Sequence, residues 1–210
     1  MKKYFITLTL IFCTIANAQQ PVKDSVNYER FIAEAGIRIS VGKLADKIGL
    51  APEFGLWYRS RMRNNDMIDL GFTLYAPTSR REFIYFRYKE NYMVKPASVS
   101  GMVGVRFNKL YALYGNNRFR KTLEWSTTAG YAFFMYNDEI YKAGAGRQNA
   151  ETNNVAKALS TFHIGQGMKL NINNIGFQLH YNYTPYGLFS NHVADDFGSH
   201  SITFGVLYRQ

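Results

Sequence analysis

The stretch Ser160–Thr184, STFHIGQGMKLNINNIGFQLHYNYT, holds two runs in which apolar and polar residues alternate strictly. Asn173-Asn174 joins the two runs. An Asn-rich pair in this position is typical of a two-residue β-hairpin turn, because Asn tolerates the positive φ that the turn needs. The turn places Ile172 opposite Ile175, so one face of the predicted hairpin is apolar and the other is polar or lacks a side chain.

The same register predicts every other pair of the hairpin. The apolar face pairs Leu170 with Phe177, Met168 with Leu179 and Ile164 with Tyr183, and the other face pairs Lys169 with Gln178 and Gly167 with His180. Each strand runs to about 10 residues, which is the length of a tilted β-strand that crosses a bilayer.

A secretory signal peptide is expected at residues 1–18. Two lysines precede an apolar stretch from Tyr4 to Ile15, and Ala16-Asn17-Ala18 supplies the small residues of a cleavage site. Residues 19–210 are then expected to form one mature barrel domain. Cys13 is the only cysteine of the sequence and lies in this leader. The mature chain therefore offers neither a disulfide nor a thiolate metal site.

The composition and charge narrow the class of protein further. The 210 residues are 47% hydrophobic and 16% aromatic, and the mean hydropathy of -0.25 argues against helical membrane spans. Loss of the two leader lysines lowers the formal charge from +10 to +8. Because the chain is expected to be exported, anionic lipid headgroups or acidic polysaccharide are expected partners, and nucleic acid is not. Arginines inside a barrel or at its rims are an alternative explanation of the charge.

Alternation of period two recurs along the rest of the chain and predicts six more strands. They are expected within residues 31–41, 53–62, 68–75, 98–107, 122–133 and 202–208. The connections after the first, third, fifth and seventh strands are mostly long, and those after the second and sixth are very short. This asymmetry is typical of outer-membrane barrels with short periplasmic turns. The predicted fold is all-β, an eight-stranded antiparallel up-and-down transmembrane β-barrel.

The sequence also predicts the structure of four of the connections between strands. Pro77–Ala97 is expected to extend its flanking strands into an exposed hairpin or flap. Leu110–Arg120 is expected to be the longest periplasmic connection. Asn137–Leu159 is polar, contains Gly and Asn, and is expected to be a mobile exposed loop. Gly187–His200 is expected to be the last long loop.

The second and third strands are expected to turn at residues 64–66. A three-residue loop there places Arg61 opposite Asp69 as an interior ion pair, and Tyr75 opposite Gly55. A bulge in the turn would shift this pairing by one residue.

The glycines indicate which face of the wall looks inward. At least one lies on the polar face of every predicted strand. The interior of an eight-stranded barrel is only just wide enough for its side chains, so small residues are needed there. On a soluble barrel the same positions would face water, where nothing requires glycine. The apolar face is therefore expected to contact lipid. The glycines are Gly36, Gly55, Gly71, Gly104, Gly130, Gly165, Gly167, Gly176 and Gly205.

The polar face also carries charges of both signs, which predicts an interior polar network. Buried charges persist only when they are paired and hydrogen-bonded. A structural plug of ion pairs is the favoured interpretation, and an ion path is the alternative. The predicted members are Glu34, Arg38, Glu53, Arg59, Arg61, Asp69, Arg106, Glu124, Lys169 and His180, with Gln178 beside them.

In these features the chain resembles the small outer-membrane β-barrel proteins of the OmpA/OmpX type. The leader MKKYFITLTLIFCTIANAQ with Tyr-rich strands resembles the barrel family common in Bacteroidetes-type outer membranes. The resemblance covers the mature chain and rests on pattern. It implies a Gram-negative outer membrane, outer-membrane lipid and lipopolysaccharide as partners, envelope proteins as further partners, and no cofactor. The chain departs from many such barrels by ending Tyr208-Arg209-Gln210 and not on an aromatic residue.

No catalytic or metal-binding residue is predicted. Some small outer-membrane barrels are lipid A deacylases with a His and a Ser near the outer rim, so Ser199-His200-Ser201 and Ser190-Asn191-His192 are the candidates. Neither reproduces the spaced His-x-Ser of those enzymes, and the histidines lack metal-ligand spacing. The expected role is non-enzymatic, structural or in binding, and a rim-located lipid A-modifying hydrolase or a narrow pore are the alternatives.

The flap is the predicted binding site, because loops on a rigid scaffold often carry function. Its basic and aromatic side chains would hold an anionic glycan or a partner protein. Alternatively they anchor the rim among headgroups, as aromatic girdles do. The residues are Arg80, Arg81, Tyr85, Arg87, Tyr88, Lys89 and Tyr92.

Overall fold

The computed structural model describes residues 30–62, 66–78, 80–81, 83–87, 90–94, 96–116, 119–136, 139–142, 151–152, 157–189, 193 and 197–210. The predicted leader at 1–18 lies outside the described residues. None of the helices in the described ranges is long and apolar enough to cross a membrane.

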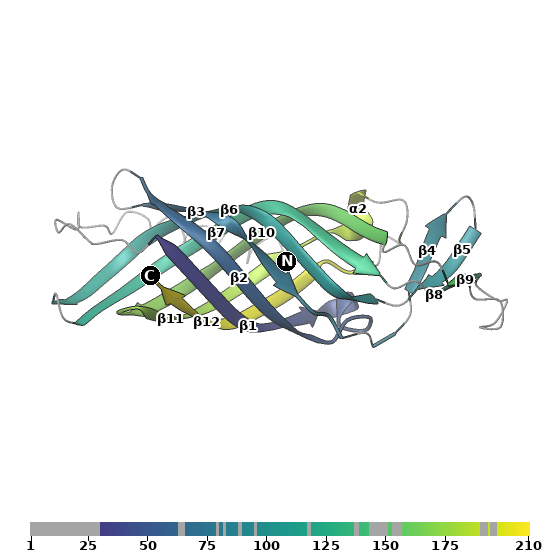
Figure 1. Cartoon of the computed structure of the whole chain (residues 1–210), viewed down its shortest axis with the longest axis horizontal. Coiled ribbons are helices and arrows are strands. Elements are labelled where there is room, and N and C mark those ends of the chain that lie inside the picture. The colour runs from purple at the N-terminus through teal and green to yellow at the C-terminus, as the bar shows by residue number, and fades with distance from the viewer. Residues whose placement is uncertain are drawn as a thin grey trace, which may run out of the picture.

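Eight antiparallel strands close into a barrel in the order β1-β12-β11-β10-β7-β6-β3-β2 (Figure 1). Barrel strands that follow one another along the chain are neighbours in the wall, and β12 closes the barrel against β1. The predicted eight-stranded antiparallel up-and-down architecture is therefore confirmed. The barrel strands are β1 (Phe31–Val41), β2 (Leu50–Arg61), β3 (Met67–Tyr75), β6 (Pro96–Asn116), β7 (Phe119–Tyr136), β10 (Lys157–Ile172), β11 (Ile175–Tyr183) and β12 (His200–Arg209).

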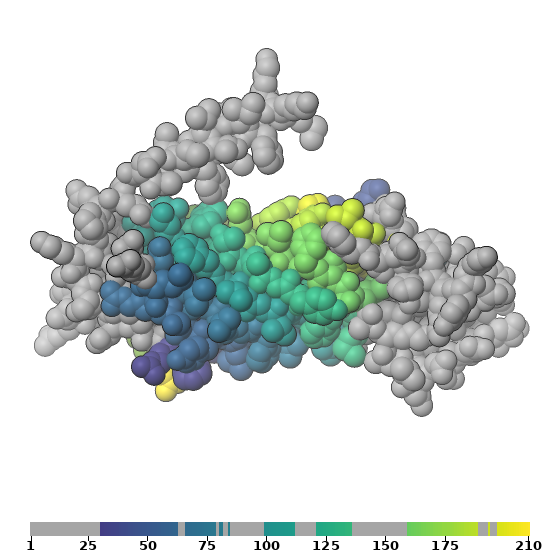
Figure 2. Space-filling model, turned by 90° about the horizontal axis from the view of Figure 1, so that it is seen from above, coloured from purple at the N-terminus to yellow at the C-terminus, as the bar shows by residue number. Residues whose placement is uncertain are grey.

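The two faces of the wall have opposite chemistry. Outward apolar side chains are strongly exposed, for example Phe31 at 62% and Val103 at 60%, whereas Asp69 and Lys169 on the inward face are at 0% and 1%. Seen from above, β2 and β3 (blue), β6 and β7 (teal) and β10 and β11 (green) form a continuous wall (Figure 2). The expected orientation, apolar outside and polar inside, is confirmed.

The hairpin of β10 and β11 has the predicted register. Leu170 pairs with Phe177 and Lys169 pairs with Gln178. Asn173 takes a φ of 52°, which is the left-handed conformation expected for an Asn in this turn. The alternation and the two-residue turn admit a single register, so the pairing follows from the sequence.

The predicted register of β2 and β3 is wrong. Asp69 faces Arg59 and not Arg61, and Tyr75 faces Glu53 and not Gly55. The last pair is Arg61 with Met67, and the connection spans residues 62–66, closed by a bond from the Met62 amide to the Asp66 carbonyl. A five-residue loop preserves which side chains point inward, because the shift is an even number of residues.

The expected long connection at Leu110–Arg120 is also wrong. β6 continues to Asn116 and β7 begins at Phe119, so only two residues join them. The register between the strands shifts between Leu110 and Ala112. A bulge of this kind interrupts the alternation on which the strand assignment rests.

A second sheet, of order β4-β5-β8-β9, lies beyond the long-loop end of the barrel (Figure 1). β4 (Phe83–Arg87) and β5 (Glu90–Val94) form the hairpin expected at Pro77–Ala97. β8 (Glu139–Lys142) and β9 (Glu151–Thr152) lie within Asn137–Leu159, the segment expected to be a mobile exposed loop, and β10 already begins at Lys157. The predicted end of that loop at Leu159 is therefore wrong. The two short strands are not evident in the sequence because backbone pairing of β8 with β5 needs no apolar alternation.

Several inward glycines are paired across strands. Gly36 faces Gly205, and Gly104 faces Gly71 on one side and Gly130 on the other. A Cβ on Gly104 would lie 2.5 Å from the Ala129 carbonyl oxygen. These glycines are therefore required because neighbouring backbones approach closely there, as well as by the narrow interior.

Candidate functional site

The centre of the interior is a network of ion pairs that begins at Arg59. Its Nε donates to Asp69 Oδ1 at 2.8 Å, and its Nη2 donates to Asp69 Oδ2 and Glu124 Oε2, both at 3.1 Å. Arg209 Nη1 lies 3.5 Å from Glu124 Oε1. Charges from β2, β3, β7 and β12 are thus held together, and all four side chains are almost completely buried.

Glu34 of β1 extends the network toward the long-loop end. Arg106 donates to it from Nη1 at 2.5 Å and from Nη2 at 3.0 Å, and Lys169 Nζ donates at 3.1 Å. Lys169 Nζ also lies 3.7 Å from Asp69 Oδ2, which joins the two groups. The Arg106 guanidinium lies 3.8 Å from the centre of the Trp57 ring. Charge pairing and packing therefore fill this level of the barrel together.

A third ion pair lies closer to the long-loop end of the barrel than these groups do. Arg38 Nε donates to Glu53 Oε2 at 2.5 Å, and the Thr203 hydroxyl donates to the same carboxylate at 3.3 Å. The Arg38 guanidinium also lies 4.3 Å from the centre of the Tyr75 ring. Arg38 thus links the polar interior to the aromatic side chains at the mouth.

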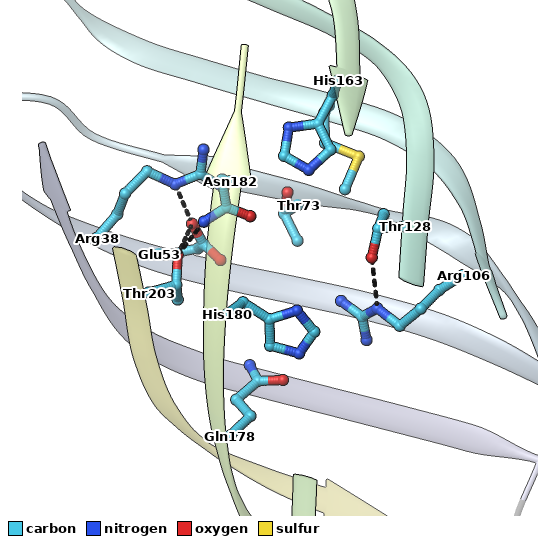
Figure 3. A pocket seen from close by; sticks show the side chains of 11 residues that line it. Arg38, Glu53, Thr73, Arg106, Thr128, His163, Gln178, His180, Asn182 and Thr203 are labelled. Carbon is cyan, nitrogen blue, oxygen red and sulfur yellow. Dashed lines mark hydrogen bonds and ion pairs between the residues drawn. The ribbon is translucent and has the colours of Figure 1, made fainter. Parts of the chain in front are cut away.

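A small cavity lies between the levels of Arg38 and Arg106 (Figure 3). Its volume of about 10 Å³ is close to the minimum for one water molecule. Three buried atoms that line it have no hydrogen-bond partner within the described part of the chain: Thr73 Oγ1, Gln178 Oε1 and His180 Nε2. The cavity is too small for a hydrated ion and is polar enough for a single water.

An apolar cap covers the long-loop end of the interior. The short helix α2 (Tyr186–Phe189) brings Tyr186 against Tyr75, with 3.2 Å between the two hydroxyl oxygens. Thr161 donates to the Pro185 carbonyl at 3.1 Å, and His163 Nδ1 lies 3.2 Å from the Thr184 hydroxyl. The cap core consists of Leu44, Ile48, Phe134, Leu159, Tyr186, Val193 and Phe197.

The sequence does not predict the cap, because most of its members come from connections without periodicity, and only Phe134 and Leu159 belong to barrel strands. Leu44 belongs to the 3-10 helix η1 (Gly42–Leu44), and Tyr186, Val193 and Phe197 come from the last long connection. Their signal in the sequence is their apolar character in otherwise polar loops. Burial in the cap raises the pKa of the Tyr186 phenol well above its ordinary value, and the Tyr75 hydroxyl adds to this rise.

Nine of the ten residues expected in the interior network line the inside of the described barrel. Arg61 is the exception: it is exposed at the end of β2, opposite Met67. Arg209 was missed, although it continues the inward alternation of Thr203, Gly205 and Leu207. The unusual Tyr208-Arg209-Gln210 ending therefore places a charge in the network.

The flap residues are only partly described. Arg80 and Arg81 are exposed, and the Arg80 side chain and amide bond the carbonyls of Ala45 and Lys47. The strands β4 and β5 carry Tyr85, Arg87 and Tyr92, but the side chains of these residues lie outside the described part, as do Tyr88 and Lys89.

The rim does not assemble a His–Ser pair from residues 199–201. His200 is exposed on the outward face, where its Nδ1 lies 2.5 Å from the Tyr181 hydroxyl, whereas Ser201 is buried on the inward face. Ser190, Asn191 and His192 lie outside the described residues. Among the described residues, no group of three or more His, Cys, Asp or Glu is placed to hold a metal ion.

No protein-family model matches the chain, and a search of curated proteins found no match. Its fold is similar to the crystal structure of Ail, the attachment invasion locus protein of Yersinia pestis, in complex with the heparin analogue sucrose octasulfate. The TM-score is 0.46 and the sequence identity is 13%, over 88% of this chain and 100% of that chain. At these values the likeness carries no argument about the function of this chain.

Proposed function

We propose that the protein is an integral outer-membrane barrel that is closed to flow, catalyses no reaction, and presents its long-loop end to a partner. The inversion of the wall carries the proposal: exposed side chains such as Val103, Tyr131 and Phe204 are apolar, whereas charged side chains are buried inside. Closed barrels of this kind satisfy every backbone polar group between strands, which a bilayer requires. The expected leader at 1–18 supports export.

Closure to flow is supported by the interior. Paired charges from seven strands occupy the lumen, the cavity beside them has a volume of about 10 Å³, and an apolar cap covers the long-loop end. A narrow pore would need a continuous wet path. A structural role for the network therefore accounts for more of these contacts than an ion path does.

The partner-binding surface is proposed at the sheet of β4, β5, β8 and β9. Exposed Arg80 and Arg81 lie where the chain enters β4, and the sequence of the flap adds Arg87 and Lys89. Basic and aromatic side chains on a rigid scaffold suit an anionic glycan, with lipopolysaccharide as the nearest source, or an acidic surface of an envelope protein.

Four measurements test this proposal. The barrel should partition with outer membranes, require detergent for extraction, and shift its gel mobility on heating. Charge reversal of Arg81, Arg87 and Lys89 to Glu should weaken retention on immobilised lipopolysaccharide, while the same reversal at the short-turn end, Lys121→Glu, should not. Equal retention of both variants would remove the flap as the binding site, and recovery of the mature protein from the periplasm without detergent would remove the membrane assignment.

A further inference from the structure

Two polar side chains interrupt the apolar outer wall of the barrel. Gln166 of β10 and Thr127 of β7 are partners across these neighbouring strands. Both point outward, because the residues directly before and after each of them in the chain are buried on the inward face. The pair is therefore polar in a surface that otherwise suits lipid. The outward side chains around it are Phe107, Trp125, Ala129, Ile164, Met168 and Tyr181.

Gln166 lies near the middle of the apolar band. From residue 166 the chain reaches the end of β10 at Ile172, at the short turn. This distance is about 15 Å along the barrel axis, for a rise of about 3.3 Å per residue and a tilt of about 40°. The apolar band of such barrels is about 25 Å tall. Ile164 on one side and Met168 and Leu170 on the other are 45% to 47% exposed. The amide is thus too far from either headgroup layer to reach it.

The neighbouring side chains cannot satisfy the Gln166 amide. A carboxamide has two N–H donors and an oxygen with two lone pairs. Thr127 offers one hydroxyl, and the Tyr181 hydroxyl already lies 2.5 Å from His200 Nδ1. A polar group left without partners in hydrocarbon is costly, because no water is present to replace them. Gln166 therefore needs a hydrogen-bonding group that lipid chains do not provide.

We propose that Gln166 lies at a contact between two copies of this chain, which associate side by side in the membrane through β7 and β10. A carboxamide complements itself, since each N–H can donate to the oxygen of the other amide. In a two-fold dimer a residue beside the axis meets its own copy. Both copies enter the membrane in the same direction, so the axis follows the membrane normal and can pass beside an outward residue.

Symmetry favours a second copy over an unrelated membrane protein as the partner. An unrelated protein would need its own polar group at the same depth, whereas a second copy supplies one at that depth by symmetry. The small side chain of Ala129, exposed beside the pair, lets two walls approach closely. The inference rests on the proposed membrane location.

The first test locates the contact while Gln166 is kept. Met168→Cys places a thiol next to Gln166 on the same outward face. Leu56→Cys is the matched control, because Leu56 is also outward and β2 lies on the opposite side of the eight-stranded barrel from β10. A short bifunctional thiol reagent applied to intact outer membranes should convert Met168→Cys mainly to a dimer and leave Leu56→Cys mainly monomeric. Mass spectrometry of the product identifies both partners.

The second test removes the amide. Copies labelled with donor and acceptor dyes through Leu56→Cys, away from the contact, are diluted in phospholipid vesicles, and energy transfer gives the dimer dissociation constant. Gln166→Leu should raise this constant about tenfold. Thr127→Val, which removes only the neighbouring hydroxyl, should leave it within about twofold. Heating gels report whether each barrel has formed.

Three results would overturn the proposal. They are equal crosslinking of Met168→Cys and Leu56→Cys, an unchanged dissociation constant in Gln166→Leu, and a crosslinked product that joins Met168→Cys to a different polypeptide. In each case a heat-shifted, detergent-dependent barrel would leave the proposed function standing.

Discussion

Arg59 of β2 faces Asp69 of β3, and its Nε lies 2.8 Å from Asp69 Oδ1. Both side chains are almost completely buried, and the same guanidinium reaches Glu124 of β7. The pair thus connects three strands in the middle of a closed lumen. Loss of either partner would leave an uncompensated charge with no access to water.

Replacement of Arg59 by Ala is expected to destabilise the barrel by about 3–5 kcal/mol, because Asp69 and Glu124 would remain buried without their main partner. Arg61→Ala is the matched control, since Arg61 is exposed on the same strand, and its effect should stay within about 0.5 kcal/mol. Urea unfolding in detergent, followed by tryptophan fluorescence, measures both. A larger effect at Arg61 would favour the register in which Arg61 faces Asp69.

Substitution of a glycine that faces another glycine across the strands is expected to lower the free energy of unfolding more than substitution of a glycine whose nearest neighbours are side-chain atoms. A Cβ at position 104 would lie 2.5 Å from a carbonyl oxygen, whereas one at position 165 would lie 3.1 Å from the His163 ring. Gly104→Ala should therefore cost about 1–3 kcal/mol and Gly165→Ala less than about 1 kcal/mol. The urea midpoints of the two variants report the difference, and equal midpoints would show that backbone crowding does not set the cost.

The cap should weaken in alkaline solution. Burial raises the pKa of Tyr186 above its ordinary value, so the neutral phenol is favoured in the folded cap. This contribution is complete below the unfolded pKa of about 10, and it is lost as the pH rises through that value toward the folded pKa. Hydrogen exchange of Tyr186–Leu188 should accelerate more steeply above about pH 10 than the intrinsic rate does.

Tyr186→Phe should remove this excess pH dependence, at a cost of about 1 kcal/mol for the lost bond to Tyr75. Tyr131→Phe is the control, because Tyr131 is 59% exposed on the outer wall. If the exchange rates of wild type and Tyr186→Phe change with pH in the same way, the cap does not depend on the Tyr186 phenol.

The reconstituted barrel should show no conductance above leak. Replacement of residues 185–199 by a short Gly-Ser linker should not change this result, because paired charges fill the lumen beneath the cap. Planar bilayer recordings of both proteins provide the measurement. Steady channels in the linker variant alone would assign the seal to the cap, and steady channels in wild type would support a pore.

The sequence determines the register between two neighbouring strands only where both the alternation and the length of the turn are known. For β10 and β11 the two-residue turn at Asn173 leaves one register. For β2 and β3 the alternation determines only which side chains point inward, so loops of three and five residues are equally compatible with it. Arg61 and Arg59 therefore could not be distinguished as the partner of Asp69.

The cap could not be predicted for a different reason. Leu44 and Phe197 lie far apart in the sequence and belong to segments with no regular period. Their contact depends on the closed barrel bringing the first and last long connections together. The flap residues remain a prediction, because a basic and aromatic segment identifies a chemistry but not a partner.

Spin labels on alternate positions of β11 test the inverted wall most directly. Single cysteines at Phe177, Leu179 and Tyr181 should report strong collisions with oxygen dissolved in the bilayer, and cysteines at Gln178, His180 and Asn182 should report weak collisions. The mature chain is expected to carry no other cysteine, since Cys13 lies in the leader. Strong oxygen collisions at the second set and weak ones at the first would contradict an apolar exterior in lipid around a sealed polar interior.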